Sequence, residues 1–207
     1  MYRNFGIMRP ASALVSEAYT MSSKVVVLDI DDVLTITREK VYEAMRAASG
    51  KDIHWQHWSE YDLRPRFEMT HEDIMDVFNS HDIINQVDPE PDAAPFINLC
   101  RDAGYRVVAL TARGWHPDAD LHTWAYFERY QLKVDELHIC TPVECKSDYI
   151  RQLGNVHLYV DDHLRHIMNV REKTDNVRHL VLMDRPWNQT EEPIERVFQL
   201  SECQRFL

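Results

Sequence analysis

Short runs of aliphatic residues recur along the chain, and each run ends at a polar residue. Continuous apolar runs of this length, rich in branched residues, are typical of strands buried on both faces of a parallel sheet. Five such strands are predicted: Val25–Leu28, Arg106–Leu110, Leu137–Cys140, Val156–Val160 and His179–Met183.

Segments with helical periodicity lie between the predicted strands. They cover residues 38–49, 70–79, 92–103, 117–130 and 146–154. Thr70 is a typical N-cap, and Gly50 and Gly104 follow the first and third of these helices. Alternation of strands and helices predicts an α/β fold, with a parallel sheet flanked by helices.

The connection between the first two strands is unusually long. About eighty residues separate Asp29 from Thr111, far more than a simple strand–helix–strand crossover needs. We interpret the excess, residues 37–88, as a small helical cap inserted after the first strand. The core domain then comprises residues 24–36 and 89–207.

Residues 1–23 show no periodicity and no continuous apolar core, so they are a poor secretory signal. Arg3 and Arg9 give a faint likeness to a transit peptide. We expect instead an N-terminal extension that lies outside the core.

The charge and composition restrict the classes of partner. The formal net charge of −11 argues against a long nucleic-acid footprint, which requires clustered Lys and Arg. No apolar stretch is long enough to span a bilayer, so we expect no membrane partner. The four cysteines show neither zinc-type nor disulfide spacing, which favours reduced thiols and a cytoplasmic location. A homodimer is compatible with the sequence.

Acidic residues follow two of the predicted strands. Asp29 and Asp31 are two residues apart, so in extended chain they project to the same side. Asp161 and Asp162 follow a later strand, and Thr111 follows another. Because the carboxyl ends of parallel strands line one edge of the sheet, we expect these five residues to converge there. Mg²⁺ prefers oxygen ligands, so the predicted metal ligands are Asp29, Asp31, Asp161 and Asp162.

This set of residues suits the hydrolysis of phosphate esters. Asp29 can attack phosphorus, and Asp31 can protonate the leaving oxygen and later deprotonate water. Thr111 can donate a hydrogen bond to a phosphoryl oxygen. Lys146 can place a positive charge against the same group and keep Asp29 ionised.

These residues, in this order, resemble the four motifs of the haloacid dehalogenase superfamily of phosphatases. The motifs are Asp29-x-Asp31-x-Val33, Thr111, Lys146 and Asp161-Asp162. The resemblance implies a Rossmann-like core, dependence on Mg²⁺, Asp29 as nucleophile and Asp31 as acid and base. It also implies that the backbone carbonyl of Asp31 binds the metal. One departure is Asp32, which stands where many members have glycine.

Within this superfamily the chain is most similar to the 5'(3')-deoxyribonucleotidase group. The likeness rests on aromatic residues in the cap, on the second motif Leu110–Arg113, and on the turn Asp184–Asn188. Aromatic side chains suit stacking on a nucleobase, so the expected substrate is a nucleoside monophosphate. The predicted substrate-binding residues are Trp55, Trp58, Tyr61, Ala112 and Arg113.

Two other functions share these features: a polynucleotide 3'-phosphatase, and a catalytically silent binding protein on the same fold. The acidic charge counts against the first, and the intact set of carboxylates and lysine against the second. The three cap aromatics are also typical of a cap core. The pairs His54/His57 and His163/His166 are more typical of surface or packing histidines than of metal ligands.

Overall fold

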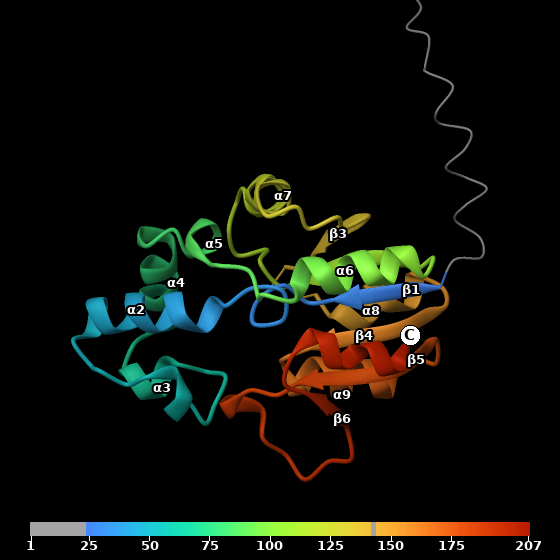
Figure 1. The fold of residues 1–207 in the computed structure, drawn as a ribbon. Coiled ribbons are helices and arrows are strands. Elements are labelled where there is room, and N and C mark those ends of the chain that lie inside the picture. The colour runs from blue at the N-terminus through green and yellow to red at the C-terminus, as the bar shows by residue number, and fades with distance from the viewer. Residues whose placement is uncertain (1–23, 142–143) are drawn as a thin grey trace, which may run out of the picture.

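The computed structural model describes residues 24–141 and 144–207, and within them one parallel sheet forms the centre of the protein (Figure 1). Its strand order is β3-β2-β1-β4-β5-β6, and every neighbouring pair is parallel. The strands are β1 (Val25–Leu28), β2 (Arg106–Thr111), β3 (Glu136–Ile139), β4 (Val156–Asp161), β5 (Val177–Met183) and β6 (Glu195–Val197). This order and the flanking helices confirm the predicted Rossmann-like α/β fold.

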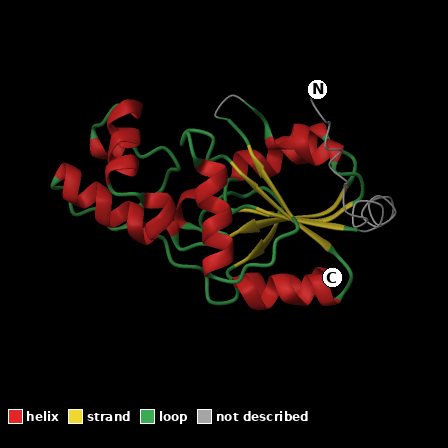
Figure 2. Ribbon diagram, turned by 90° about the horizontal axis from the view of Figure 1, so that it is seen from above, coloured by secondary structure: helices red, strands yellow, loops and turns green. Residues whose placement is uncertain are grey.

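Helices cover both faces of the sheet (Figure 2). Those that follow the sheet strands are α6 (Ala93–Asp102), α7 (Ala119–Arg129), α8 (Lys146–Gln152) and α9 (Leu164–Lys173), with short 3₁₀ turns η2 (Pro186–Asn188) and η3 (Leu200–Phe206). Successive residues of β1 pack into two different apolar clusters, Val25 and Val27 in one, Val26 and Leu28 in the other. All four are fully buried, so β1 is covered on both faces, as its unbroken apolar run predicts.

The chain turns sharply after β1. The carbonyl of Ile30 accepts hydrogen bonds from the backbone N–H groups of Val33, Leu34 and Thr35, at 3.2, 2.8 and 3.0 Å. Asp32 lies inside this turn with φ +57°, the left-handed region that glycine adopts freely and that Asp tolerates better than most residues. The backbone at this position therefore suits glycine and also accepts Asp.

A helical insert follows this turn and lies beyond the carboxyl end of β1, as predicted (Figure 1). It contains α2 (Thr37–Ser49), η1 (Trp55–His57), α3 (Arg64–Phe67), α4 (His71–Ser80) and α5 (Ile83–Gln86). The entering and leaving segments run side by side, since Ile36 N–H donates to the Asp88 carbonyl and Glu90 N–H to the Leu34 carbonyl. The division of the chain into a core and a cap domain at these boundaries stays a prediction.

Most predicted helices are confirmed to within two residues. Thr70 caps α4 in a reciprocal capping box with Asp73, as its sequence indicates. The helix predicted over residues 117–130 begins at Ala119 in α7, so Pro117 precedes it. The prediction of an N-terminal extension falls on residues 1–23, which lie outside the described residues.

Among the described residues, no helix combines the length and the apolar character that crossing a membrane requires.

Gly114 is expected to be essential for the loop after β2. Its N–H donates to the Cys140 carbonyl at 3.1 Å, and a Cβ at this position would lie 2.5 Å from that oxygen. Gly114→Ala therefore forces a backbone shift, and we expect it to lower the free energy of unfolding by about 1–3 kcal/mol in urea titrations. Ala112→Ser, at the exposed neighbouring position, should change it by less than about 0.5 kcal/mol. Equal stabilities of the two variants would contradict this account.

Candidate active site

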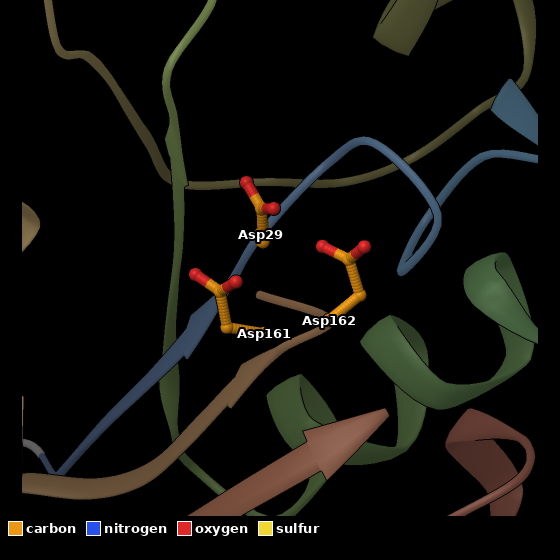
Figure 3. A group of neighbouring side chains, drawn as sticks. All are labelled: Asp29, Asp161 and Asp162. Atoms are coloured by element: carbon orange, nitrogen blue, oxygen red, sulfur yellow. The ribbon is translucent and has the colours of Figure 1, made fainter. Parts of the chain in front are cut away.

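Three carboxylates from two neighbouring strands meet at the carboxyl edge of the sheet (Figure 3). Asp29 follows β1, Asp161 ends β4 and Asp162 follows it. One ligand oxygen from each lies within 4.8 Å of the others, and all three side chains are buried. The parallel pairing of Leu28 with Val160 sets this proximity, because it brings the two strand ends level.

Crowding shapes the ionisation of this cluster. Burial raises the pKa of Asp29 to about 7, with Asp161 and Asp31 adding to the rise and Lys146 opposing it. Burial also raises the pKa of Asp162, together with the charges of Asp161 and Asp29. Two carboxyls of the cluster therefore resist ionisation until positive charge is supplied.

Lys146 lies between two of these carboxylates. Its Nζ is 2.7 Å from Asp29 Oδ1 and 2.8 Å from Asp161 Oδ2, and the side chain is 2% exposed. Although burial opposes its charge, Asp161 and Asp29 raise the pKa of Lys146 above its ordinary value. These contacts hold a cation in the first turn of α8, where the helix dipole disfavours one.

Asp161 is surrounded by donors. Tyr159 donates its hydroxyl to Oδ2, the His163 backbone N–H donates to Oδ1 at 2.7 Å, and His166 Nδ1 lies 3.3 Å from Oδ2. Burial would raise the pKa of Asp161, but Lys146 and His166 outweigh it and lower the pKa. These contacts therefore favour the ionised form of Asp161.

The side chain of Asp31 points to a different partner. Arg113 Nε and Nη2 donate to its two oxygens at 2.8 and 2.7 Å, and Thr37 Oγ1 donates at 2.8 Å. Burial raises the pKa of Asp31, but Arg113 and Thr37 outweigh it and hold the pKa below its ordinary value. Asp31 thus stands beside the cluster of three, with its carboxylate paired to a buried guanidinium.

Thr111 ends β2 with its side chain buried and its Oγ1 without a hydrogen-bond partner among residues 24–141 and 144–207. A buried hydroxyl without a hydrogen-bond partner destabilises the folded protein, and a ligand oxygen that accepts its hydrogen bond would remove this penalty. The geometry fits the predicted donation of a hydrogen bond to an oxygen that a substrate brings.

The three cap aromatics predicted to bind the substrate differ in exposure. Trp58 is 4% exposed and packs on Phe67, so it belongs to the core of the insert. Trp55 is half-buried, with the Arg38 guanidinium 5.1 Å from its ring. Tyr61 is 55% exposed and stacks on His163 at 4.0 Å.

Although the residue as a whole is exposed, desolvation of the Tyr61 hydroxyl and the charge of Asp162 raise its pKa well above the ordinary value. Ala112 is exposed in the loop after β2. Among the predicted substrate-binding residues, Tyr61 and Ala112 are therefore the exposed ones.

Sequence reasoning missed several residues that hold the cluster. Trp187 Nε1 donates to Asp162 Oδ2 at 2.8 Å, and Asn188 Nδ2 donates to the Asp162 carbonyl at 2.6 Å. Tyr159 and His166 contact Asp161. The spacing of Tyr159 and Asp161 on one strand could have indicated their contact, whereas Trp187 and His166 reach the site only through the fold.

The three buried carboxylates fit a divalent cation. They offer hard oxygen ligands at close quarters, and a cation would relieve the repulsion that raises the pKa of Asp29 and Asp162. The side chain of Asp31 is engaged by Arg113, and the group of three carboxylates does not include it. That Asp31 binds the metal stays a prediction.

Comparisons with known proteins agree on the architecture. The chain matches no protein-family model, and no curated protein matches it. It is similar in structure to a dehalogenase, with TM-score 0.58 and 16% identity over 90% of this chain and 98% of that one. It is also similar to a predicted phosphatase from Clostridium acetobutylicum, with TM-score 0.62 and 12% identity over 89% and 98% of the two chains. A predicted phosphoglycolate phosphatase from Haemophilus somnus gives TM-score 0.62 and 10% identity over 89% and 98%.

The chain therefore shares the α/β fold of these dehalogenase and phosphatase structures. The buried Asp29, Asp161 and Asp162 lie at the edge of the sheet where parallel α/β folds bind ligands. The comparisons give the fold, and the likeness to the deoxyribonucleotidase group stays a prediction.

Mg²⁺ should stabilise the protein. A free Mg²⁺ concentration of about 100 times the Kd adds about 2.7 kcal/mol to the free energy of unfolding. Tm should therefore rise in thermal scans with Mg²⁺ and fall back to the metal-free value when a chelator is added. Asp162→Asn removes one carboxylate, and we expect most of this rise to disappear. Asp76→Asn, at an exposed position on α4, should keep it. A full Mg²⁺ effect in Asp162→Asn would place the cation elsewhere.

Without metal, Asp162→Asn should instead stabilise the protein. The pKa of Asp162 is raised on folding, so its ionisation costs stability above the unfolded pKa of 3.8, and the cost grows with pH. Asn removes it, and each pKa unit is worth about 1.4 kcal/mol. Urea titrations in chelator should show a larger advantage of the variant at pH 7.5 than at pH 5. An advantage that shrinks as pH rises would contradict the assigned repulsion.

Proposed function

We propose that the protein is a Mg²⁺-dependent phosphomonoesterase that hydrolyses nucleoside monophosphates through an aspartyl-phosphate on Asp29. The observation that supports it best is the meeting of Asp29, Asp161, Asp162 and Lys146 at one edge of the sheet. A nucleophile, a fixed cation and a site for a second cation are the elements that phosphoryl transfer requires.

In the first half of the reaction, a carboxylate oxygen of Asp29 attacks phosphorus. The bond between phosphorus and the leaving oxygen breaks, and Asp31 gives that oxygen its proton. The product alcohol leaves, and the phosphoryl group stays on Asp29 as an acyl phosphate.

In the second half, water attacks the same phosphorus and Asp31 takes a proton from it. The bond between phosphorus and Asp29 breaks, so inorganic phosphate is released and the Asp29 carboxylate is restored.

The remaining residues neutralise charge. Lys146 touches Asp29 Oδ1, and the Thr111 hydroxyl can donate to a phosphoryl oxygen. Held by Asp29, Asp161 and Asp162, Mg²⁺ would supply the electrostatic stabilisation that the phosphoryl oxygens need.

Arg113 sets the protonation of Asp31. In the structure the guanidinium favours the ionised carboxylate, which suits removal of a proton from water. A phosphate dianion beside Arg113 competes for the guanidinium and raises the pKa of Asp31, which prepares it to donate a proton. Asp31 would thus donate a proton while a phosphate dianion lies beside Arg113, and would accept a proton when Arg113 pairs with Asp31 alone.

Tyr61 supports a nucleotide substrate. It is the exposed member of the three cap aromatics, and its ring lies over His163 beside the acidic cluster. A planar base could stack on this ring with little preference among bases, because every base has a flat face.

A panel of substrates tests the proposal. With Mg²⁺, phosphate release from (deoxy)nucleoside monophosphates should exceed release from a 3'-phosphorylated oligonucleotide. The reverse order would identify a polynucleotide 3'-phosphatase. No release from either, with intact Mg²⁺ binding, would favour a silent binding protein.

Asp29→Asn tests the covalent route. Removing a nucleophile typically costs orders of magnitude in rate, and we expect kcat to fall by about 10⁴-fold or more. Circular dichroism should show an intact fold, and Asp76→Asn should retain wild-type kcat. Turnover by Asp29→Asn near the wild-type rate would rule out attack by this residue.

A further inference from the structure

The short turn η2, which follows β5, donates hydrogen bonds to both the side chain and the backbone of Asp162. Trp187 Nε1 donates to Asp162 Oδ2 at 2.8 Å. Its neighbour Asn188 donates through Nδ2 to the carbonyls of Asp162 and Met183, at 2.6 and 2.8 Å. The turn therefore sets both the backbone and the side chain of this carboxylate.

The turn itself is held firmly. Asn188 is buried, its Oδ1 accepts from the Arg185 backbone N–H at 3.2 Å, and its carbonyl accepts from Arg196 Nη2 at 2.6 Å. The indole of Trp187 packs on the buried Trp58 of the insert, with 6.1 Å between ring centroids. Packing on one side and a hydrogen bond on the other fix the orientation of the indole N–H.

This contact matters because Asp162 is repelled by its neighbours. Asp29 and Asp161 lie close to it, and no cation of the chain is paired with its side chain among the described residues. Without a hydrogen-bond donor, electrostatic repulsion would favour rotation of the Asp162 carboxylate away from Asp29 and Asp161. In Figure 3 one oxygen of Asp162 points toward Asp29 and the other points away. A donor on one oxygen holds the other where a cation can use it.

We propose that Trp187 is a positioning residue for the cation site: its indole N–H holds the Asp162 carboxylate in the orientation that binds the metal. This inference rests on the proposed Mg²⁺ site. It adds a residue that none of the four motifs contains and that links the helical insert to the acidic cluster.

Trp187→Phe tests the inference, because it keeps an aromatic ring against Trp58 and removes the donor. Calorimetric titration of the metal-free protein with Mg²⁺ should give a Kd raised about 10–100-fold, the usual effect of losing a partner of a metal ligand. The Mg²⁺ concentration for half-maximal phosphate release should rise in parallel, while kcat at saturating Mg²⁺ stays within about threefold of wild type. Trp124→Phe, on an exposed part of α7, should leave both constants unchanged.

The outcomes separate this inference from the proposed function. A wild-type Mg²⁺ Kd in Trp187→Phe overturns the inference and leaves the proposed function standing. A lowered Tm with an unchanged Kd also overturns it, because the role is then structural. Failure of the unsubstituted chain to bind Mg²⁺ overturns both. If Trp187→Phe does not fold, benzothienylalanine at position 187, which keeps the shape of the indole without its N–H, provides the same comparison.

Discussion

Repulsion among buried carboxylates is the constraint on which this site depends. Asp29, Asp161 and Asp162 are held together out of water, an arrangement that is unfavourable without compensating charge. Lys146 compensates for part of it from α8, and a divalent cation would compensate for the rest. The sheet provides the rigidity, since β1 and β4 pair in parallel beneath the cluster. The fold thus keeps a costly charge arrangement that a bound cation would relieve.

The environment of the neighbouring Asp31 shifts its pKa in the opposite direction from that of Asp29. Arg113 and Thr37 bind its carboxylate and hold its pKa low, while Asp29 two residues earlier has a raised pKa. The two side chains have different partners, Lys146 for Asp29 and Arg113 for Asp31. Two carboxyls that are two residues apart therefore differ in protonation tendency, as the proposed roles of nucleophile and proton carrier require.

The helical insert contributes to the site through few residues. Tyr61 stacks on His163, and Trp58 packs on Trp187, whose indole donates to Asp162. The insert enters and leaves the core through paired segments at Ile36 and Glu90. Through Trp58, the insert therefore packs on the indole that donates to Asp162.

The sequence by itself determined the α/β sheet, the helical insert and the convergence of the acidic strand ends. These follow from local information, because buried strands need unbroken apolar runs and parallel strands align their carboxyl ends. Only the tertiary structure decided that Arg113 pairs with Asp31, that Trp58 is core while Tyr61 is exposed, and that Trp187 reaches Asp162. Such contacts join residues that are tens of positions apart in the sequence. The types of these residues do not reveal which of them lie close together in the folded protein. The short strand β6 was also missed, since its three residues carry too little apolar pattern to be distinguished from a loop.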